Sequence, residues 1–217
     1  MKEKSAIFVG NDVVDLTDAD SVDILNNKRV MLRALNSNEL HFVENSDNQL
    51  VAFWSVWAAK ESAFKALSQR FPDVLFIPKN FHVSENFSEV KYRHIKLKLQ
   101  IDKNNSYIHA LCVLGKSPID SIKYWIRPKD FILQNYSKEI GIDVNQSTLV
   151  RILLKKEIQK IFPEVSTKNI LISKMENHSA PKVSLQNASG ETNLSASFSH
   201  HGEYLATAIQ LPNGVLS

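Results

Sequence analysis

The alternation of hydrophobic and polar residues predicts a chain in which helices and short strands occur in clusters. Two stretches show helical periodicity without an internal glycine or proline. Residues 50–67 carry Phe53 and Trp57 on an apolar side, and residues 149–162 form an amphipathic pattern that stops at Pro163. These two segments are predicted to be the main helices of the protein.

Weaker helical signals precede residue 50. Residues 21–35 mix apolar and polar positions in a pattern that favours a single helix. A further helix is expected to begin at Asn36, because Glu39 follows three residues later. That spacing is typical of a capping box, in which the side chain of each residue bonds the backbone amide of the other.

Alternation with a period of two residues predicts strands, one of which, over residues 6–9, is expected to end at Gly10. Residues 102–106 form a hairpin-like connection, and residues 136–147 read as a linker or a short helix. Helices packed on antiparallel sheets, an α+β fold, are therefore expected. The other predicted strands are residues 81–83, 95–101, 107–114, 122–126, 169–173, 182–185, 195–199 and 204–211.

Composition narrows the class of protein. A chain of 217 residues that is 43% hydrophobic and 23% charged can form one generous domain or two small ones. The single Cys112 excludes an intramolecular disulfide framework and argues against a thiolate zinc site. The apolar run over residues 6–9 is too short for a signal peptide, and no stretch is long enough to span a membrane, so a cytoplasmic protein is expected.

The net charge of +3 is too small to indicate nucleic-acid binding, and no nucleic-acid or membrane partner is expected. Basic residues are nevertheless concentrated between Arg151 and Lys182. This local excess fits a phosphorylated ligand or an acidic partner. A solvated helix face explains the same charges and is favoured on charge alone.

Two short motifs carry the candidate chemistry. Residues 9–15 place Asp12 just after a glycine at the end of an apolar segment, where backbone can approach a ligand closely. In residues 57–65, Glu61 and Lys65 are four positions apart and share one helix face. Two carboxylates and an ammonium group suit a hard cation that holds phosphate oxygens.

Plain structural readings exist for the same residues. Glu61 and Lys65 have the spacing of an ordinary helix ion pair that stabilises by about 0.2–0.5 kcal/mol, and taken alone this reading is favoured. Asp12 and Asp15 could begin a turn. The indole of Trp57, like that of Trp54, is expected to belong to the core rather than to a substrate site.

A third segment, Ser197-Phe198-Ser199-His200-His201-Gly202-Glu203-Tyr204, changes this balance when it is combined with the first two. Taken alone, its histidine pair could lie in a surface loop. The three together resemble the signature of the 4′-phosphopantetheinyl transferase superfamily: G-x-D, then an aromatic-x-x-K-E-[AS]-x-x-K helix, and an S-x-S-H segment. The resemblance reaches both ends of the chain.

The order of the motifs resembles the small holo-acyl-carrier-protein-synthase type of the family, whereas the length resembles the larger surfactin-synthetase type. The resemblance thus implies a pseudo-dimer of two similar helix-plus-antiparallel-sheet halves in swapped order, with one site between them. The expected halves are residues 1–118 and residues 119–217, and the protein is expected to be a monomer.

The resemblance also implies a reaction. Phosphopantetheine would move from coenzyme A to a serine of an acyl or peptidyl carrier protein, as in fatty acid biosynthesis, with Mg²⁺ as cofactor. Asp12 and Glu61 would hold the metal, Glu61 would accept the serine proton, and Lys65 would hold the transferring phosphate. Asp15 is the third candidate metal ligand, because Val14 stands where the larger type has an acidic residue.

On the coenzyme A side, the resemblance implies that His200 and Ser199 contact a phosphate. Lys182 and Arg151 are further candidates, although Lys182 follows an Ala180-Pro181 pair where the family often has Lys-Pro. Two other functions stay open: a non-catalytic, carrier-binding scaffold of the same fold, and a coenzyme A hydrolase that uses the same metal site.

Overall fold

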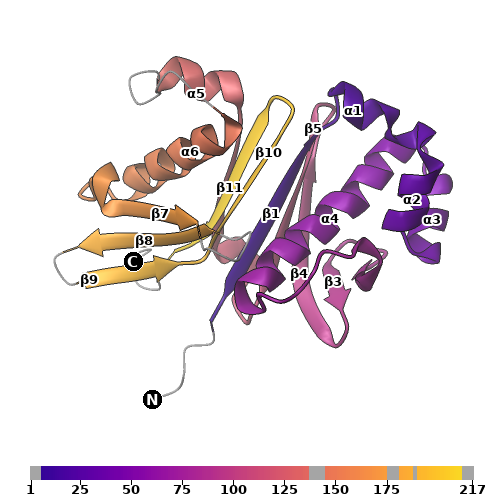
Figure 1. The fold of residues 1–217 in the computed structure, drawn as a ribbon, viewed down its shortest axis with the longest axis horizontal. Coiled ribbons are helices and arrows are strands. Elements are labelled where there is room, and N and C mark those ends of the chain that lie inside the picture. The colour runs from indigo at the N-terminus through magenta and orange to yellow at the C-terminus, as the bar shows by residue number, and fades with distance from the viewer. Residues whose placement is uncertain (1–5, 137–144, 175–180, 188–189, 212–217) are drawn as a thin grey trace.

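The computed structural model describes residues 6–136, 145–174, 181–187 and 190–211. Strand β1 (Phe8–Asp15) runs through the middle of the molecule, with one group of helices and strands on each side of it (Figure 1). Helices pack on antiparallel sheets throughout, so the predicted α+β class is confirmed.

The first sheet has five antiparallel strands in the order β1-β5-β4-β3-β2, and helix α4 (Gln49–Arg70) lies across one face of it. Strands β4 and β5 form the expected hairpin, whereas β3 was not predicted. The bounds are β2 Phe81–Val83, β3 Glu89–Tyr92, β4 Ile95–Lys103 and β5 Tyr107–Leu114.

Small side chains let α4 approach the sheet closely. Ala59, Ala63 and Ala66 are fully buried on the helix, and the glycine of β1, Gly10, faces them. A Cβ at Gly10 would collide with the carbonyl oxygen of Ser62 and the backbone nitrogen of Ala66. The sequence of β1 therefore fixes the distance between the strand and the helix.

The prediction that the first strand ends at Gly10 was wrong. β1 continues past Gly10 to Asp15 and pairs along its whole length with β5. The polar side chains of the segment, which suggested a turn, find partners inside the fold: Asn11 contacts His109 at 3.3 Å, and Asp12 contacts Lys65 at 2.6 Å.

The helix predicted over residues 21–35 is broken into three short pieces, because Asn27 caps a new start by accepting the amide of Val30. The capping box of Asn36 and Glu39 is confirmed, and it opens helix α3. The bounds are α1 Ala19–Val22, η1 Asp23–Asn26, α2 Lys28–Ala34 and α3 Ser37–Glu44, and η2 spans Pro78–Asn80 after α4.

A buried ion pair ties α4 to these N-terminal helices. Lys60 is fully buried and contacts the Glu39 carboxylate at 2.5 Å. Its ammonium group also donates to the carbonyl oxygens of Ala34 at 2.8 Å and Pro78 at 3.1 Å. Burial lowers the pKa of Lys60, and the charge of Glu39 opposes this effect.

The other side of the molecule holds two three-stranded sheets, ordered β10-β11-β6 and β7-β8-β9, and helix α6 (Gln146–Ile161). Strand β9 and helix α5 were not predicted, and the expectation for residues 136–147 falls largely outside the described residues. The remaining bounds are η3 Ile119–Ser121, β6 Ile122–Pro128, α5 Lys129–Asn135, η5 Thr167–Asn169, β7 Ile170–Lys174, β8 Pro181–Asn187, β9 Gly190–Leu194, β10 Ala196–His201 and β11 Tyr204–Gln210.

The sheet edges β1 and β10 lie side by side (Figure 1), and side chains from residues 195–201 bond the backbone of β1. We call this contact the seam. It joins β1 to the β10–β11 hairpin, which lies more than 180 residues further along the chain. The division into similar halves at residue 118 stays a prediction.

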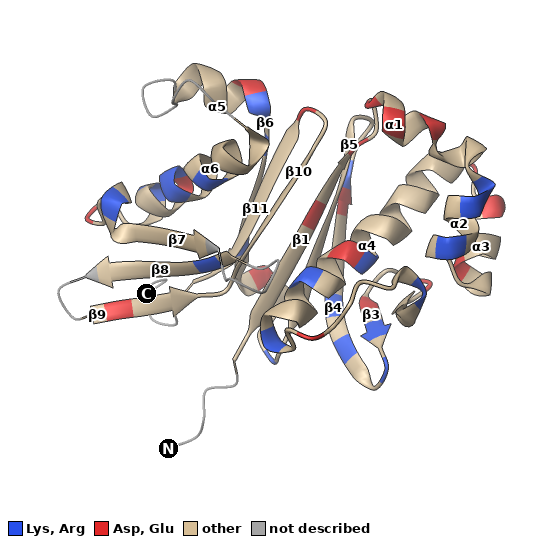
Figure 2. Ribbon diagram, in the orientation of Figure 1, with Lys and Arg blue, Asp and Glu red and all other residues tan. Residues whose placement is uncertain are grey.

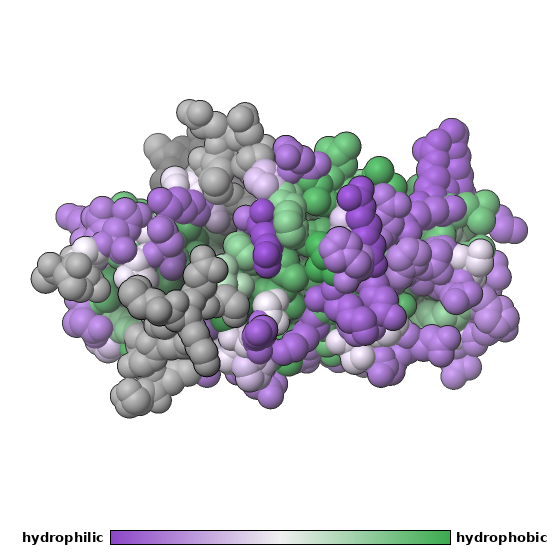
Figure 3. Space-filling model, turned by 90° about the horizontal axis from the view of Figure 1, so that it is seen from below, coloured by the Kyte–Doolittle hydropathy of each residue, from purple (hydrophilic) through white to green (hydrophobic). Residues whose placement is uncertain are grey.

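The described residues include no helix that is both long and apolar enough to cross a membrane. On the face in Figure 3, hydrophilic side chains cover most of the right-hand part, and hydrophobic ones show through mainly near the middle.

Candidate active site

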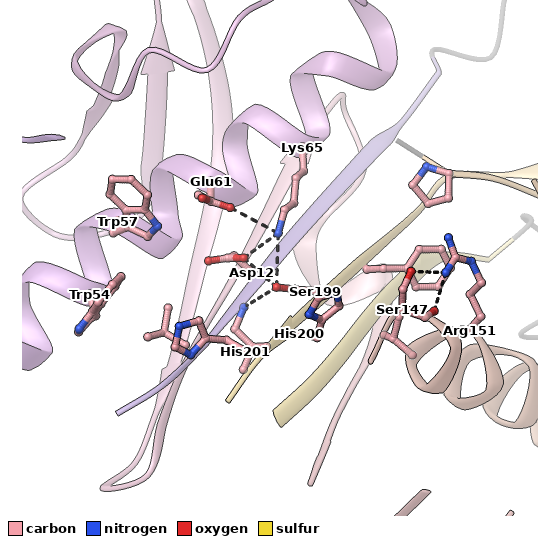
Figure 4. Close-up of a pocket in the computed structure, with 15 residues that line it drawn as sticks. Asp12, Trp54, Trp57, Glu61, Lys65, Ser147, Arg151, Ser199, His200 and His201 are labelled. Carbon is pink, nitrogen blue, oxygen red and sulfur yellow. Dashed lines mark hydrogen bonds and ion pairs between the residues drawn. The ribbon is translucent and has the colours of Figure 1, made fainter. Parts of the chain in front are cut away.

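A pocket of about 470 Å³ opens between the two sides of the molecule. Helix α4 and strand β1 form one wall, and strand β10 and helix α6 form the other (Figure 4). The polar and aromatic side chains on its lining are Asp12, Trp54, Trp57, Glu61, Lys65, Ser147, Arg151, Phe198, Ser199, His200 and His201.

Lys65 is the centre of a charged cluster on the first wall. Its ammonium nitrogen lies 2.6 Å from Asp12 Oδ1 and 3.7 Å from Glu61 Oε2. Asp12 projects from β1 toward α4, and Glu61 lies one helical turn before Lys65. The plain helix pair of the sequence interpretation is thus one edge of a larger cluster that two elements build.

Burial and the neighbouring charges shift the pKa values of the groups in this cluster. Burial raises the pKa of the Glu61 carboxyl, and the negative charge of Asp12 raises it further, against the opposing charge of Lys65. Burial alone would lower the pKa of Lys65, but the charges of Asp12 and Glu61 outweigh it and raise that pKa. A carboxyl with a raised pKa beside a firmly protonated lysine is suited to accept a proton.

Ser199 connects the two walls. Its hydroxyl donates to Asp12 Oδ1 at 2.8 Å and accepts the backbone N–H of Val13 at 3.1 Å. The nitrogen of Lys65 lies 3.4 Å away. Ser199 therefore holds the cluster from the side of β10, where the sequence predicted a contact with coenzyme A.

His200 and Arg151 face the cluster from the second wall (Figure 4). Partial desolvation and the charge of Lys65 lower the pKa of His200, which favours its neutral imidazole. Arg151 donates to the carbonyl oxygen of Ser147 at 2.6 Å and also to its hydroxyl. The structure thus brings six of the predicted site residues around one pocket: Asp12, Glu61, Lys65, Ser199, His200 and Arg151.

Asp15 and Lys182 are not among the residues that line this pocket. Asp15 is 1% exposed, and its oxygens accept from the backbone of Thr17 at 2.8 Å and of Glu203 at 2.9 Å. Burial would raise its pKa, but these hydrogen bonds lower it overall. Lys182 lies on β8, where its nitrogen is 3.6 Å from the carboxylate of Glu191.

Part of the cluster of basic residues between Arg151 and Lys182 lies on helix α6. Figure 2 shows basic residues spaced along this helix. Lys155 and Lys168 line a second hollow of about 360 Å³ beside the pocket, and Arg151 lines both. Most of the predicted basic face therefore borders a neighbouring surface rather than the charged cluster.

Trp54 and Trp57 were expected in the core, and they also line the pocket. The indole N–H of Trp54 donates to the carbonyl oxygen of Ser21 at 3.0 Å, and its ring lies 6.2 Å from that of His201. Trp57 lies one turn before Glu61 and hydrogen-bonds it. The four-residue spacing of Trp57 and Glu61 was a usable signal for this placement.

Asp12 and Glu61 fit a magnesium ion. Their two carboxylates repel each other, and a divalent cation between them would relieve the repulsion that raises the Glu61 pKa. Mg²⁺ often takes one or two protein carboxylates and completes its shell with water and substrate phosphate. The described residues contain no group of three or more His, Cys, Asp or Glu side chains placed to hold a metal, so a fully protein-made cage is not formed there.

Comparison with known families bears on this geometry. Residues 8–112 match the model of the 4′-phosphopantetheinyl transferase superfamily, and this range contains Asp12, Glu61 and Lys65. Ser199 and His200 lie outside the matched range. A search of curated proteins finds no match. By residues 8–112, the chain is similar to the 4′-phosphopantetheinyl transferase superfamily.

Proposed function

We propose that the protein transfers 4′-phosphopantetheine from coenzyme A to a serine of an apo acyl or peptidyl carrier protein, in a Mg²⁺-dependent reaction. The serine Oγ forms a bond to the phosphorus that carries pantetheine. The bond from that phosphorus to the bridging diphosphate oxygen breaks, and adenosine 3′,5′-bisphosphate leaves with the bonding electrons. The serine proton passes to a base.

The observation that carries this proposal is the position of Lys65. It lies between Asp12 and Glu61 at 2.6 and 3.7 Å and faces a pocket whose opposite wall holds His200 and Arg151. Phosphoryl transfer needs positive charge on the transferring group and in-line placement more than covalent chemistry. Cationic or donor groups on both walls meet the first need.

Each side chain then has a role. Lys65 stabilises charge on the transferring phosphoryl group as a point charge. Glu61, with its raised pKa, takes the serine proton. His200 and Arg151 bind coenzyme A phosphates, and Ser199 orients Asp12 by its 2.8 Å bond.

Mg²⁺ held by Asp12 and Glu61 would neutralise the diphosphate as charge develops on the leaving group. Trp54 and Trp57 line the same wall of the pocket. We also propose that the chain acts as a monomer in which residues 1–118 and 119–217 are the two halves, with the site between them. Size-exclusion chromatography with light scattering tests this, and an obligate trimer would contradict it.

The decisive experiment incubates the protein with coenzyme A, Mg²⁺ and a panel of apo carriers, and weighs each carrier by mass spectrometry. We expect one phosphopantetheine per carrier, and we expect Asp12→Asn and Glu61→Gln to abolish the gain while far-UV circular dichroism stays unchanged. No gain across the panel would favour a non-catalytic scaffold. Release of the bisphosphate without any carrier would indicate a hydrolase.

A further inference from the structure

The seam is made by side chains rather than by backbone pairing. β1 pairs with β5 and β10 pairs with β11, and the bonds that β1 amides make across the seam end on side-chain atoms of residues 195–201. Alternate amides of β1 donate, each to the residue 186 positions later. The pairs are Val9 to Ser195 Oγ at 2.8 Å, Asn11 to Ser197 Oγ at 2.9 Å, Val13 to Ser199 Oγ at 3.1 Å and Asp15 to His201 Nδ1 at 3.2 Å.

The hydroxyls also donate onward, because a serine oxygen can accept and donate at once. Ser199 donates to Asp12, as described above. Ser195 donates to Gln69 Oε1 at 2.8 Å. The seam is therefore connected at one point to the charged cluster and at its far end to α4.

Gln69 joins three elements with one side chain. It lies on α4 one turn after Lys65, and its amide donates to the carbonyl oxygen of Val9 on β1 at 2.5 Å. The same amide donates to the carbonyl oxygen of Ala196 on β10 at 3.2 Å. Gln69 thus fixes the position of β10 relative to the helix that carries Glu61 and Lys65.

We propose that Ser195, Ser197 and Gln69 are positioning residues that set the alignment of β10 on β1, and thereby place Ser199 and His200 opposite Asp12 and Lys65. This inference rests on the proposed function for its kinetic consequences. A slip of two residues moves β10 by roughly 6.6 Å and carries His200 out of the pocket. The side-chain bonds of the seam oppose that slip.

Ser197 is the sharpest place to test the proposal. It is 2% exposed, and its hydroxyl accepts a hydrogen bond from the backbone amide of Asn11. Unlike Ser199, it is not bonded to Asp12 or Lys65. Ser197→Ala removes this bond, and Ser197→Thr keeps the hydroxyl. Ser55→Ala is the matched control, because Ser55 is 3% exposed and its hydroxyl donates only within α4, to the Val51 carbonyl oxygen at 2.7 Å.

Two structural measurements need no activity. Amide hydrogen exchange at Asn11 should be about tenfold faster in Ser197→Ala than in wild type, since tenfold corresponds to losing a bond of about 1.4 kcal/mol. The NOE between the rings of Trp54 and His201, which lie 6.2 Å apart across the pocket, should weaken in Ser197→Ala and in Gln69→Met. Ser197→Thr and Ser55→Ala should match wild type in both.

Kinetics with a carrier that the wild type modifies supply the third measurement. We expect kcat to fall about tenfold in Ser197→Ala and Gln69→Met, with KM for the carrier unchanged, because the catalytic groups are misaligned and not removed. Ser195→Ala, at the half-buried end of the seam, should show a smaller loss of kcat. This variant replaces Ser197→Ala in the test if Ser197→Ala does not fold.

The outcomes separate cleanly. Faster exchange with unchanged kcat would overturn the proposal, and so would a lower kcat with unchanged exchange and NOE. Parallel changes in all three, restored by Ser197→Thr, support it. If wild type modifies no carrier, the proposed function fails, and exchange and NOE still decide whether these residues set the alignment.

Discussion

The contact of β1 with α4 and the contact of β1 with β10 both shape the pocket, but they depend on different physics. Against α4, Gly10 allows backbone to approach Ser62 and Ala66, so the fit is steric. Against β10, alternate amides meet side-chain hydroxyls, so the fit is polar. A closely packed contact is disrupted when a side chain gains even one methyl group. A hydrogen-bonded contact is disrupted instead when the acceptor is removed and a buried N–H is left without a partner.

The two contacts therefore have different roles in building the pocket. The α4 side carries Asp12, Glu61 and Lys65, whose mutual distances are fixed by packed backbone. The seam side brings Ser199 and His200 to that preassembled cluster. We therefore expect changes on the α4 side to cost stability first, and changes at the seam to cost alignment first.

The largest expected effect tests how firmly α4 is anchored. Lys60→Met should destabilise the protein by about 3–5 kcal/mol, because it leaves the Glu39 carboxylate buried and unpaired. Urea denaturation measures the loss. The double variant Lys60→Met/Glu39→Gln should recover part of it, since the amide keeps an acceptor without the charge. A loss below about 1 kcal/mol in the single variant would show that this pair does not anchor α4.

The next effect tests the steric half of the comparison. Gly10→Ala should destabilise by about 3 kcal/mol, because its Cβ meets backbone atoms that cannot rotate away. Ser195→Ala, which removes a polar contact from the half-buried end of the seam, should cost about 1 kcal/mol. Thermal and urea unfolding of both variants measure this difference. Equal losses would remove the distinction between the two contacts.

The third effect depends on pH. A raised pKa means that folded Glu61 holds its proton more tightly than unfolded Glu61, with its ordinary pKa of 4.5. This stabilisation is present below pH 4.5 and is lost as pH rises through the raised pKa. Each tenfold difference in proton affinity between the folded and unfolded chain corresponds to about 1.4 kcal/mol. With metal chelated, Glu61→Gln should therefore be more stable than wild type at neutral pH in urea denaturation, and the advantage should vanish at low pH.

The protonation of Glu61 also predicts an acid limb for the reaction. Only the carboxylate form of Glu61 can accept a proton, so kcat/KM should fall as pH drops and this carboxyl becomes protonated. A kcat/KM that stays constant throughout the acid range in which the protein remains folded would contradict this role.

The smallest effects lie on the coenzyme A side. His200→Ala should weaken coenzyme A binding about tenfold, the equivalent of one lost bond of about 1.4 kcal/mol, and should leave carrier binding unchanged. Lys182→Ala should change it less than about twofold, because Lys182 lies outside the pocket and contacts Glu191. Titration calorimetry with each ligand checks both. A larger effect of Lys182 would place a coenzyme A contact beyond this pocket.

Local patterns predicted the parts of the fold whose causes are local. The capping box needs only Asn36 and Glu39, and the helix of α4 needs only its own periodicity, so both were visible in the sequence. The extension of β1 to Asp15 was not visible, because its polar residues become strand-compatible only through partners such as His109 and Lys65.

In the site, too, local relationships could be predicted from the sequence and long-range ones could not. Glu61 and Lys65 could be placed together from their spacing on one helix. That Ser199 bonds Asp12 depends on a pairing across 187 residues, which no spacing rule supplies. The alternation Ser195, Ser197, Ser199, His201 was a signal for a one-sided polar strand, but it does not name the strand it would face.

The seam has a consequence for how the molecule is made. The amides of β1 leave the ribosome 186 residues before the hydroxyls that accept them. Until then, one edge of the first strand is open and can pair with any other exposed strand. Contacts of such long range form slowly, so the seam is expected to form late in folding. The newborn chain is therefore expected to be vulnerable to aggregation in the interval before β10 and β11 are made.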